Sequence, residues 1–101
     1  MRILLTTSFV LAASFATAEE VDEAKIAQCE ALGGIVTQLV ELRQDGKREK
    51  RAIRTLTKGN SAVEEKYQPV VQFLSGWVYS LTKEELTFEP GVKYTESCLT
   101  Q

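Results

Sequence analysis

The stretch CEALGGIVTQLVELRQDG, residues 29–46, decides the fold of this chain. Its apolar residues recur at intervals of three and four, which is the spacing along one side of an α-helix. They are Cys29, Leu32, Val36, Leu39 and Val40. The pattern predicts a helix over residues 21–43 that carries Cys29 on its core-facing side.

Glycines mark two places in this first helix. The pair Gly33-Gly34 costs up to ~1 kcal/mol per glycine relative to alanine. We interpret it as a point where another helix crosses closely, with a hinge or the approach of a ligand as the alternatives. After Gln44 and Asp45, Gly46 is suited to the left-handed conformation that closes a helix.

Two further helices follow by the same reasoning. The first is predicted over residues 47–57, with an apolar stripe of Ala52, Ile53 and Leu56. The second spans residues 63–81, and Pro69 predicts either a kink or the start of a separate helix there. Its stripe is Val63, Tyr67, Val70, Leu74, Trp77 and Leu81, widened by Val71 and Val78.

Capping and turn residues complete the predicted fold. Ser61–Glu64 and Thr82–Glu85 both have the pattern of a capping box, which opens a helix. The turn residues 89–91 then precede a short last helix with Val92, Thr95 and Cys98–Leu99 on one side. Since no hairpin dipeptide lies between alternating runs, the prediction is an all-α fold of three main helices and a short C-terminal helical segment.

The N-terminus has the pattern of an export signal. Arg2 precedes an apolar run to Phe15, and Ala16-Thr17-Ala18 offers the small-residue pattern of a cleavage site. Residues 1–18 are therefore predicted to be a signal peptide, and residues 19–101 a single small domain in the periplasm or outside the cell. The run is too short and too polar for a membrane span, and no later segment would cross a membrane.

The chain has two cysteines, Cys29 and Cys98. An even count in a short exported chain favours a structural disulfide. A Cys29–Cys98 bridge would tie the C-terminal segment to the first helix and contribute roughly 4 kcal/mol by the chain-entropy model. Intermolecular pairing is the alternative.

Several of these features form a pattern: Cys29 near a helix start, Arg43-Gln44 before Gly46, Val78-Tyr79 late in a helix, and the near-terminal Cys98. The pattern resembles a loosely defined, functionally uncharacterised group of small exported helical two-cysteine proteins of proteobacteria and their phages. The resemblance implies a bacterial or phage origin, an all-helical fold and the Cys29–Cys98 bridge. It implies no activity, and the basic second helix departs from the group.

The composition argues against catalysis. The chain has no histidine, and its one methionine is Met1, so the mature protein would lack two side chains common in soft-metal and acid–base sites. The carboxylate pairs Glu64-Glu65 and Glu84-Glu85 are sequence neighbours, which do not share a helix face. We expect no enzyme activity, no catalytic residue, no metal and no cofactor.

The strongest candidate for a functional surface is the basic segment from Arg43 to Lys58. It has seven basic residues against Asp45 and Glu49, whereas the rest of residues 19–101 has four basic and twelve acidic residues. Such asymmetry is typical of a surface for an anionic partner, and a solvated helix face is the alternative. Nucleic acid is not expected, because no aromatic residue is interleaved. The candidate residues are Lys47, Arg48, Lys50, Arg51, Arg54 and Lys58.

The sequence therefore predicts an exported protein that binds another macromolecule, as an accessory, inhibitor or chaperone-like module. The alternative is an envelope-surface protein that binds anionic lipid or lipopolysaccharide through the basic helix 47–58. The expected partner is thus an unidentified protein or an anionic component of the envelope. Among the aromatic residues, Trp77 is expected in the core, while Phe73 and Tyr79 fall off the stripe and, if exposed together, would form a contact patch.

Overall fold

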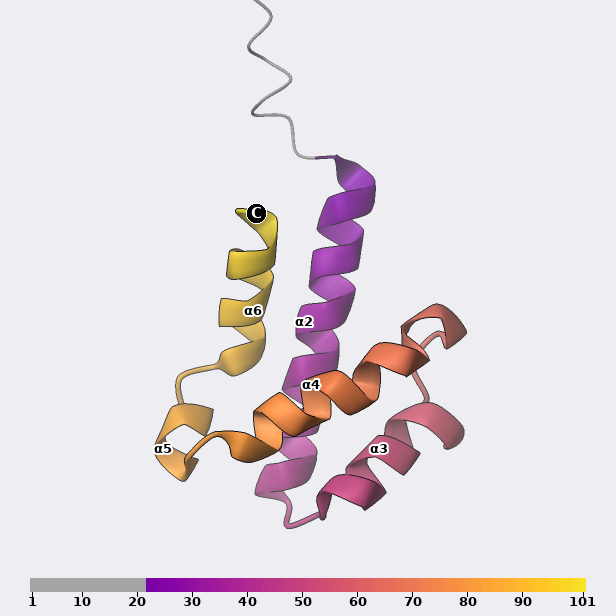
Figure 1. Cartoon of the computed structure of the whole chain (residues 1–101), viewed down its shortest axis with the longest axis vertical. Coiled ribbons are helices and arrows are strands. Elements are labelled where there is room, and N and C mark those ends of the chain that lie inside the picture. Colours follow the sequence, from indigo (N-terminus) through magenta and orange to yellow (C-terminus); the bar gives the residue numbers. More distant parts are fainter. Residues whose placement is uncertain (1–21) are drawn as a thin grey trace, which may run out of the picture.

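The computed structural model describes residues 22–101, and within this part of the chain all regular structure is helical (Figure 1). The all-α prediction is confirmed, whereas the predicted signal peptide, residues 1–18, lies outside the described residues. The elements are α2 (Glu23–Gln44), α3 (Glu49–Lys58), the 3-10 turn η1 (Glu65–Tyr67), α4 (Gln68–Ser80), α5 (Lys83–Leu86) and α6 (Pro90–Leu99).

Both ends of α2 are closed by local contacts, and the predicted closure at Gly46 is confirmed. At the start, the Asp22 carboxylate accepts from the Ala24 N–H at 3.2 Å. At the end, Gly46 has a φ of 86°, and the Lys47 N–H bonds to the Leu42 carbonyl at 2.9 Å, which is a Schellman closure. Because this closure uses Lys47, α3 begins at Glu49, two residues later than predicted.

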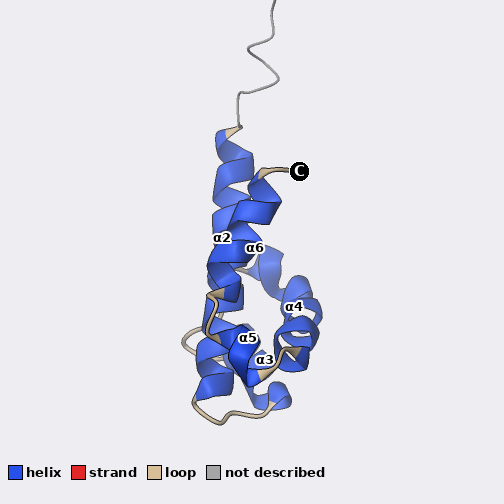
Figure 2. Ribbon diagram, turned by 90° about the vertical axis from the view of Figure 1, so that its left-hand side faces the viewer, coloured by secondary structure: helices blue, strands red, loops and turns tan. Residues whose placement is uncertain are grey.

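The core lies where α3 and α4 pack against the C-terminal half of α2, and α6 runs beside the N-terminal half (Figure 2). Most of the two predicted stripes is buried as expected, whereas Leu32 and Ile53 are half-buried. The buried apolar side chains of this core are Ile35, Val36, Leu39, Val40, Ala52, Leu56, Val71, Leu74, Val78 and Leu86. No helix among residues 22–101 is long and apolar enough to cross a membrane.

Pro69 separates two helical pieces instead of kinking one helix. η1 ends at Tyr67, and α4 begins at Gln68 with Pro69 in its first turn, where a missing N–H costs little. The predicted capping box at Ser61–Glu64 is wrong, because the chain there crosses from α3 to η1. The Val63 N–H instead bonds to the Leu56 carbonyl at 2.8 Å.

The second predicted capping box, Thr82–Glu85, is confirmed. The Glu85 N–H donates to Thr82 Oγ1 at 3.1 Å, and the Thr82 N–H donates to Glu85 Oε1 at 2.8 Å. This box opens α5, whose Leu86 closes one side of the core.

The buried side of α4 is rotated from the prediction. Val71, Leu74, Ser75 and Val78 are buried, whereas Trp77, expected in the core, is 38% exposed. The reason is that α4 packs against both α2 and α3. The residues of α4 that face these two helices are therefore the ones that become buried. Buried Ser75 is satisfied because its hydroxyl donates to Glu49 Oε2 at 2.6 Å.

A disulfide joins α2 to α6, with 5.6 Å between the Cα atoms of Cys29 and Cys98. The close crossing predicted at Gly33-Gly34 is confirmed for Gly33, which faces Gly91 of α6. Residues 90–91 are therefore part of the last helix and not of the predicted turn, and the reversal takes place at Glu89, whose φ is 54°. Because Gly91 faces Gly33, the next residue, Val92, points outward. Val92 is 49% exposed and does not lie on the packed side as expected.

Candidate anion-binding surface

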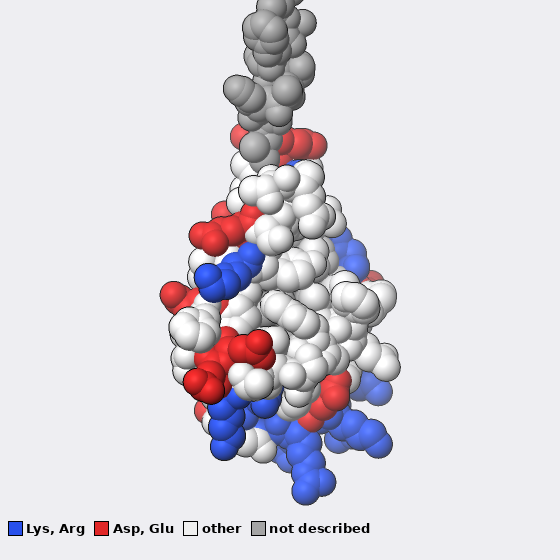
Figure 3. Space-filling model, turned by 60° about the vertical axis from the view of Figure 1, so that its left-hand side comes forward, with Lys and Arg blue, Asp and Glu red and all other residues white. Residues whose placement is uncertain are grey.

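The six candidate basic residues all lie on or next to α3, on the side opposite the core. Ala52 and Leu56 turn one side of this helix into the core, so the intervening basic residues must point outward. All six are exposed, and Lys and Arg side chains gather at this end of the molecule in Figure 3. We call this set the basic surface: Lys47, Arg48, Lys50, Arg51, Arg54 and Lys58.

Arg43, the remaining basic residue of the segment, has a structural role. Its Nη1 donates to the carbonyls of Val78 at 2.8 Å and Leu81 at 2.5 Å, at the C-terminal end of α4. The Val78 carbonyl also accepts from the Leu81 N–H at 3.2 Å, and a cation placed at this helix end adds a charged donor and interacts favourably with the helix dipole. The guanidinium also lies 5.7 Å from the ring centre of Tyr79. Arg43 therefore fixes α4 to α2 and does not belong to the basic surface.

The acidic residue in the middle of the segment is also turned toward the protein. Half-buried Glu49 accepts from the buried Ser75 hydroxyl, so its carboxylate points into the contact between α3 and α4. The outward side of α3 is thus left to the basic side chains. This arrangement leaves no carboxylate on the outward side of α3 itself.

A second hydrogen bond fixes the start of α3 against α4. The Tyr79 hydroxyl donates to the Lys47 carbonyl at 2.7 Å. Burial raises the pKa of the Tyr79 phenol, and the Glu49 carboxylate raises it further, while Arg43 acts in the opposite direction. The neutral phenol is therefore the favoured form, and it is the form that can donate this bond.

Open hollows run along the basic surface. One of about 430 Å³ lies at the start of α3 and is lined by Lys47, Arg48, Lys50, Arg51 and Arg54 with Gly46. Another of about 430 Å³ lies farther along, between Arg51, Arg54 and Lys58. Small-molecule sites are mostly apolar with a few polar groups, whereas these hollows are lined mainly by charged side chains. They suit contact with an anionic surface.

The part of the chain that the structure describes offers no other constellation of reactive groups. Residues 22–101 contain no group of three or more His, Cys, Asp or Glu side chains placed to hold a metal ion. Both cysteines are in the disulfide. The Ser75–Glu49 pair joins a hydroxyl to a carboxylate, but Ser75 is 0% exposed, so no substrate reaches it.

The structure corrects the expected aromatic patch. Phe73 is 75% exposed, as its position off the stripe indicated. Tyr79 does not join it, because it is half-buried and bonded to Lys47. Trp77 joins it instead, one turn along α4, with its ring centre 6.1 Å from that of Tyr94 on α6.

Comparison with known proteins adds no assignment to this geometry. No protein-family model matches the chain, and neither a curated protein nor a solved structure matches it. The resemblance to small exported two-cysteine proteins therefore stays a prediction.

Proposed function

We propose that this protein acts by binding an anionic macromolecular partner through the basic surface, and not by catalysis. The supporting observation is that six basic side chains share the outward side of α3 while Glu49 is turned away from it. The accessory, inhibitor or chaperone-like roles expected from the sequence are all of this kind. Export to the periplasm or beyond is part of the proposal, and the disulfide supports an oxidising compartment.

Electrostatics explains how such a surface would work. Clustered charge of one sign raises the local concentration of an oppositely charged partner and speeds its association. The effect is screened by salt over about 8 Å at physiological ionic strength. Two hydrogen bonds, from Ser75 to Glu49 and from Tyr79 to the Lys47 carbonyl, hold α3 in a fixed place, so the charges are presented in a defined arrangement.

Two partners have the required chemistry. One is a protein with an acidic surface, and the other is anionic lipid or lipopolysaccharide of the envelope. The second is favoured by an observation outside the basic surface, namely that exposed Phe73 lies on the neighbouring helix α4.

The test reverses charge on the basic surface and at matched positions elsewhere. Arg48→Glu with Arg51→Glu changes two exposed residues of the surface, and Lys83→Glu with Lys93→Glu changes two exposed lysines on α5 and α6. Both double variants alter the net charge equally. Binding is measured to the partner cross-linked in an envelope fraction and to vesicles that contain phosphatidylglycerol.

The proposal expects the first double variant to lose at least about tenfold in affinity, since each lost charge contact near an anionic surface is worth about 1 kcal/mol. The second double variant should bind like the wild type. Equal binding by all three proteins would show that the basic surface has no such function. Far-UV circular dichroism checks that both variants stay folded.

A further inference from the structure

The outer side of α4 is an apolar surface that the rest of residues 22–101 leaves largely exposed. Phe73 and Trp77 are four residues apart and so lie on the same side of the helix, and their side chains are 75% and 38% exposed. Pro69 is exposed one turn earlier on that side. We call these three residues the aromatic ridge. None of the thirteen residues of α4, Gln68–Ser80, is charged, which is unusual for a helix at the surface.

The aromatic ridge adjoins the basic surface. α3 and α4 pack side by side (Figure 1). An open hollow of about 250 Å³ is lined by Lys50, Arg54 and Lys58 of α3 together with Gln72 of α4. The cations of α3 therefore border α4, the helix that carries the aromatic ridge. In Figure 3 an uncharged area lies above the basic end, with a few acidic side chains at the border between them.

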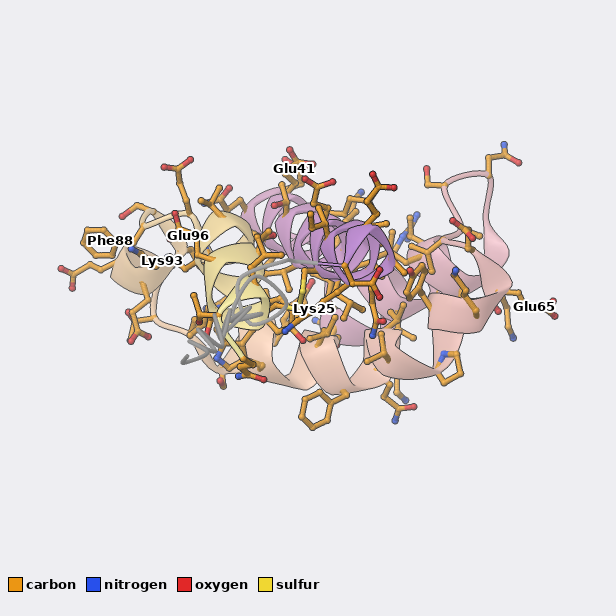
Figure 4. The ribbon with its side chains drawn as sticks, turned by 90° about the horizontal axis from the view of Figure 1, so that it is seen from above. Lys25, Glu41, Glu65, Phe88, Lys93 and Glu96 are labelled. Carbon is orange, nitrogen blue, oxygen red and sulfur yellow. A yellow bond between two sulfur atoms is a disulfide. The ribbon has the colours of Figure 1, made fainter. Side chains whose placement is uncertain are left out.

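A second exposed phenylalanine provides a contrast. Phe88, 62% exposed, projects at the end of the molecule away from α3, with Lys93 and Glu96 beside it (Figure 4). The neighbouring groove of about 270 Å³ is bordered by Glu41 and Glu89. The carboxylates beside this phenylalanine would repel an anionic partner. Charge complementarity therefore selects the aromatic ridge over Phe88.

The shape of the ridge favours a bilayer over a protein as the occupant. A protein hot spot usually fits an aromatic side chain into a preformed pocket of the partner. A bilayer interface needs no pocket, because headgroups and acyl chains rearrange around a protruding ring. Trp is enriched at membrane interfaces, and Lys and Arg beside apolar aromatic residues are typical of proteins that lie on anionic membranes.

We infer that the aromatic ridge and the basic surface together bind an anionic bilayer, with the cations at the headgroups and the rings of Phe73 and Trp77 in the interface. The inference names the partner of the proposed function and rests on it. Trp77 is the single tryptophan of the chain, so its fluorescence reports directly on the site.

The experiment titrates the protein with vesicles of phosphatidylcholine alone and with vesicles that also contain phosphatidylglycerol. With the anionic vesicles, the emission of Trp77 should shift to the blue and be quenched by lipids brominated near the headgroup. High salt should release the protein, because the cations hold it at the surface. Pure phosphatidylcholine should produce little change.

Variants separate the ridge from charge attraction alone. Phe73→Ser should weaken binding to the anionic vesicles by about tenfold or more, since it removes a large apolar side chain from the interface. Phe88→Ser is the matched control and should bind like the wild type. Both positions are exposed, so neither change should disturb the core. All the proteins are compared with the same N-terminus, so any contribution of that segment is common to them.

The outcomes keep the inference and the proposed function apart. If Phe73→Ser binds like the wild type while Arg48→Glu with Arg51→Glu does not, the bilayer inference is overturned and the basic surface keeps its function. The same holds if the wild type ignores anionic vesicles but binds an acidic protein through the basic surface. Loss of binding with Phe73→Ser, together with a blue shift in the wild type, supports the inference.

Discussion

Alanine at the two adjacent glycines of α2 should have opposite effects on stability. A Cβ atom on Gly33 would lie 1.8 Å from Thr95 Oγ1 and 2.9 Å from the Gly91 carbonyl oxygen, whereas a Cβ atom on Gly34 would meet no atom of residues 22–101 within 4 Å. In Gly33→Ala the backbone of α6 must move by about half an ångström and the Thr95 hydroxyl must rotate away. Overpacking of this kind costs up to about 3 kcal/mol, of which the better helix propensity of alanine returns about 1 kcal/mol.

The net expectation is that Gly33→Ala lowers the free energy of unfolding by about 2 kcal/mol, and that Gly34→Ala raises it by up to about 1 kcal/mol. For a domain of this size 1 kcal/mol corresponds to about 4–8 °C in Tm. Thermal and urea unfolding, followed by far-UV circular dichroism with the disulfide intact, measures both values. A Gly33→Ala variant as stable as the wild type would refute the close helix contact, and so would equal losses at the two positions.

Three other residues or pairs carry predictions of their own. Replacing Cys29 and Cys98 with alanine should lower the free energy of unfolding by about 4 kcal/mol, because the bridge closes a loop between residues 69 apart; an unchanged urea midpoint would contradict this. Arg43→Gln should cost about 2 kcal/mol, since two carbonyls at the end of α4 lose a charged donor, while Arg54→Gln on the exposed side of α3 should leave the midpoint in place. The raised pKa of Tyr79 means that the unfolded chain releases the phenol proton before the folded protein does. Stability should therefore fall as the pH rises through about 10 and above. Urea midpoints across that range should show a weaker fall for Tyr79→Phe, and an identical fall would argue against a shifted Tyr79.

The helices and the disulfide could be predicted because their signals are local. Asp22 and Gly46 close α2 with their own side chain and backbone conformation. The apolar spacing of α2 and α3 fits one register, so Cys29, Ala52 and Leu56 are buried as expected. With two cysteines there is one intramolecular pairing, and α6 brings Cys98 to the first helix.

The orientation of α4 depends on packing that the sequence pattern does not contain. Val70 and Val71 are adjacent, so the apolar residues of this helix fit two overlapping stripes. The position of α3 selects the stripe with Val71 and Val78, and Trp77 moves to the surface. Ser61–Glu64 has the same pattern as Thr82–Glu85 but forms no capping box, because Pro69 prevents one helix from running through residue 65 to residue 69.

The sequence predicts which basic residues form the candidate surface, but not which neighbouring side chains lie beside it. All six basic residues lie together because one amphipathic helix carries them. Arg43 and Glu49 leave the surface through contacts with Val78 and Ser75, which lie far away in the sequence. The exposure of the aromatic ridge follows from the same rotation of α4 that the periodicity could not settle.

Whether the basic surface contacts an anionic partner is measured most directly by the salt dependence of binding to phosphatidylglycerol vesicles for the two charge-matched double variants. The wild type and Lys83→Glu with Lys93→Glu should bind at low salt and lose affinity steeply as salt is added. Arg48→Glu with Arg51→Glu should bind weakly at every salt concentration. If the two double variants give the same affinities and the same salt dependence, the basic surface is not the site that contacts the anionic partner.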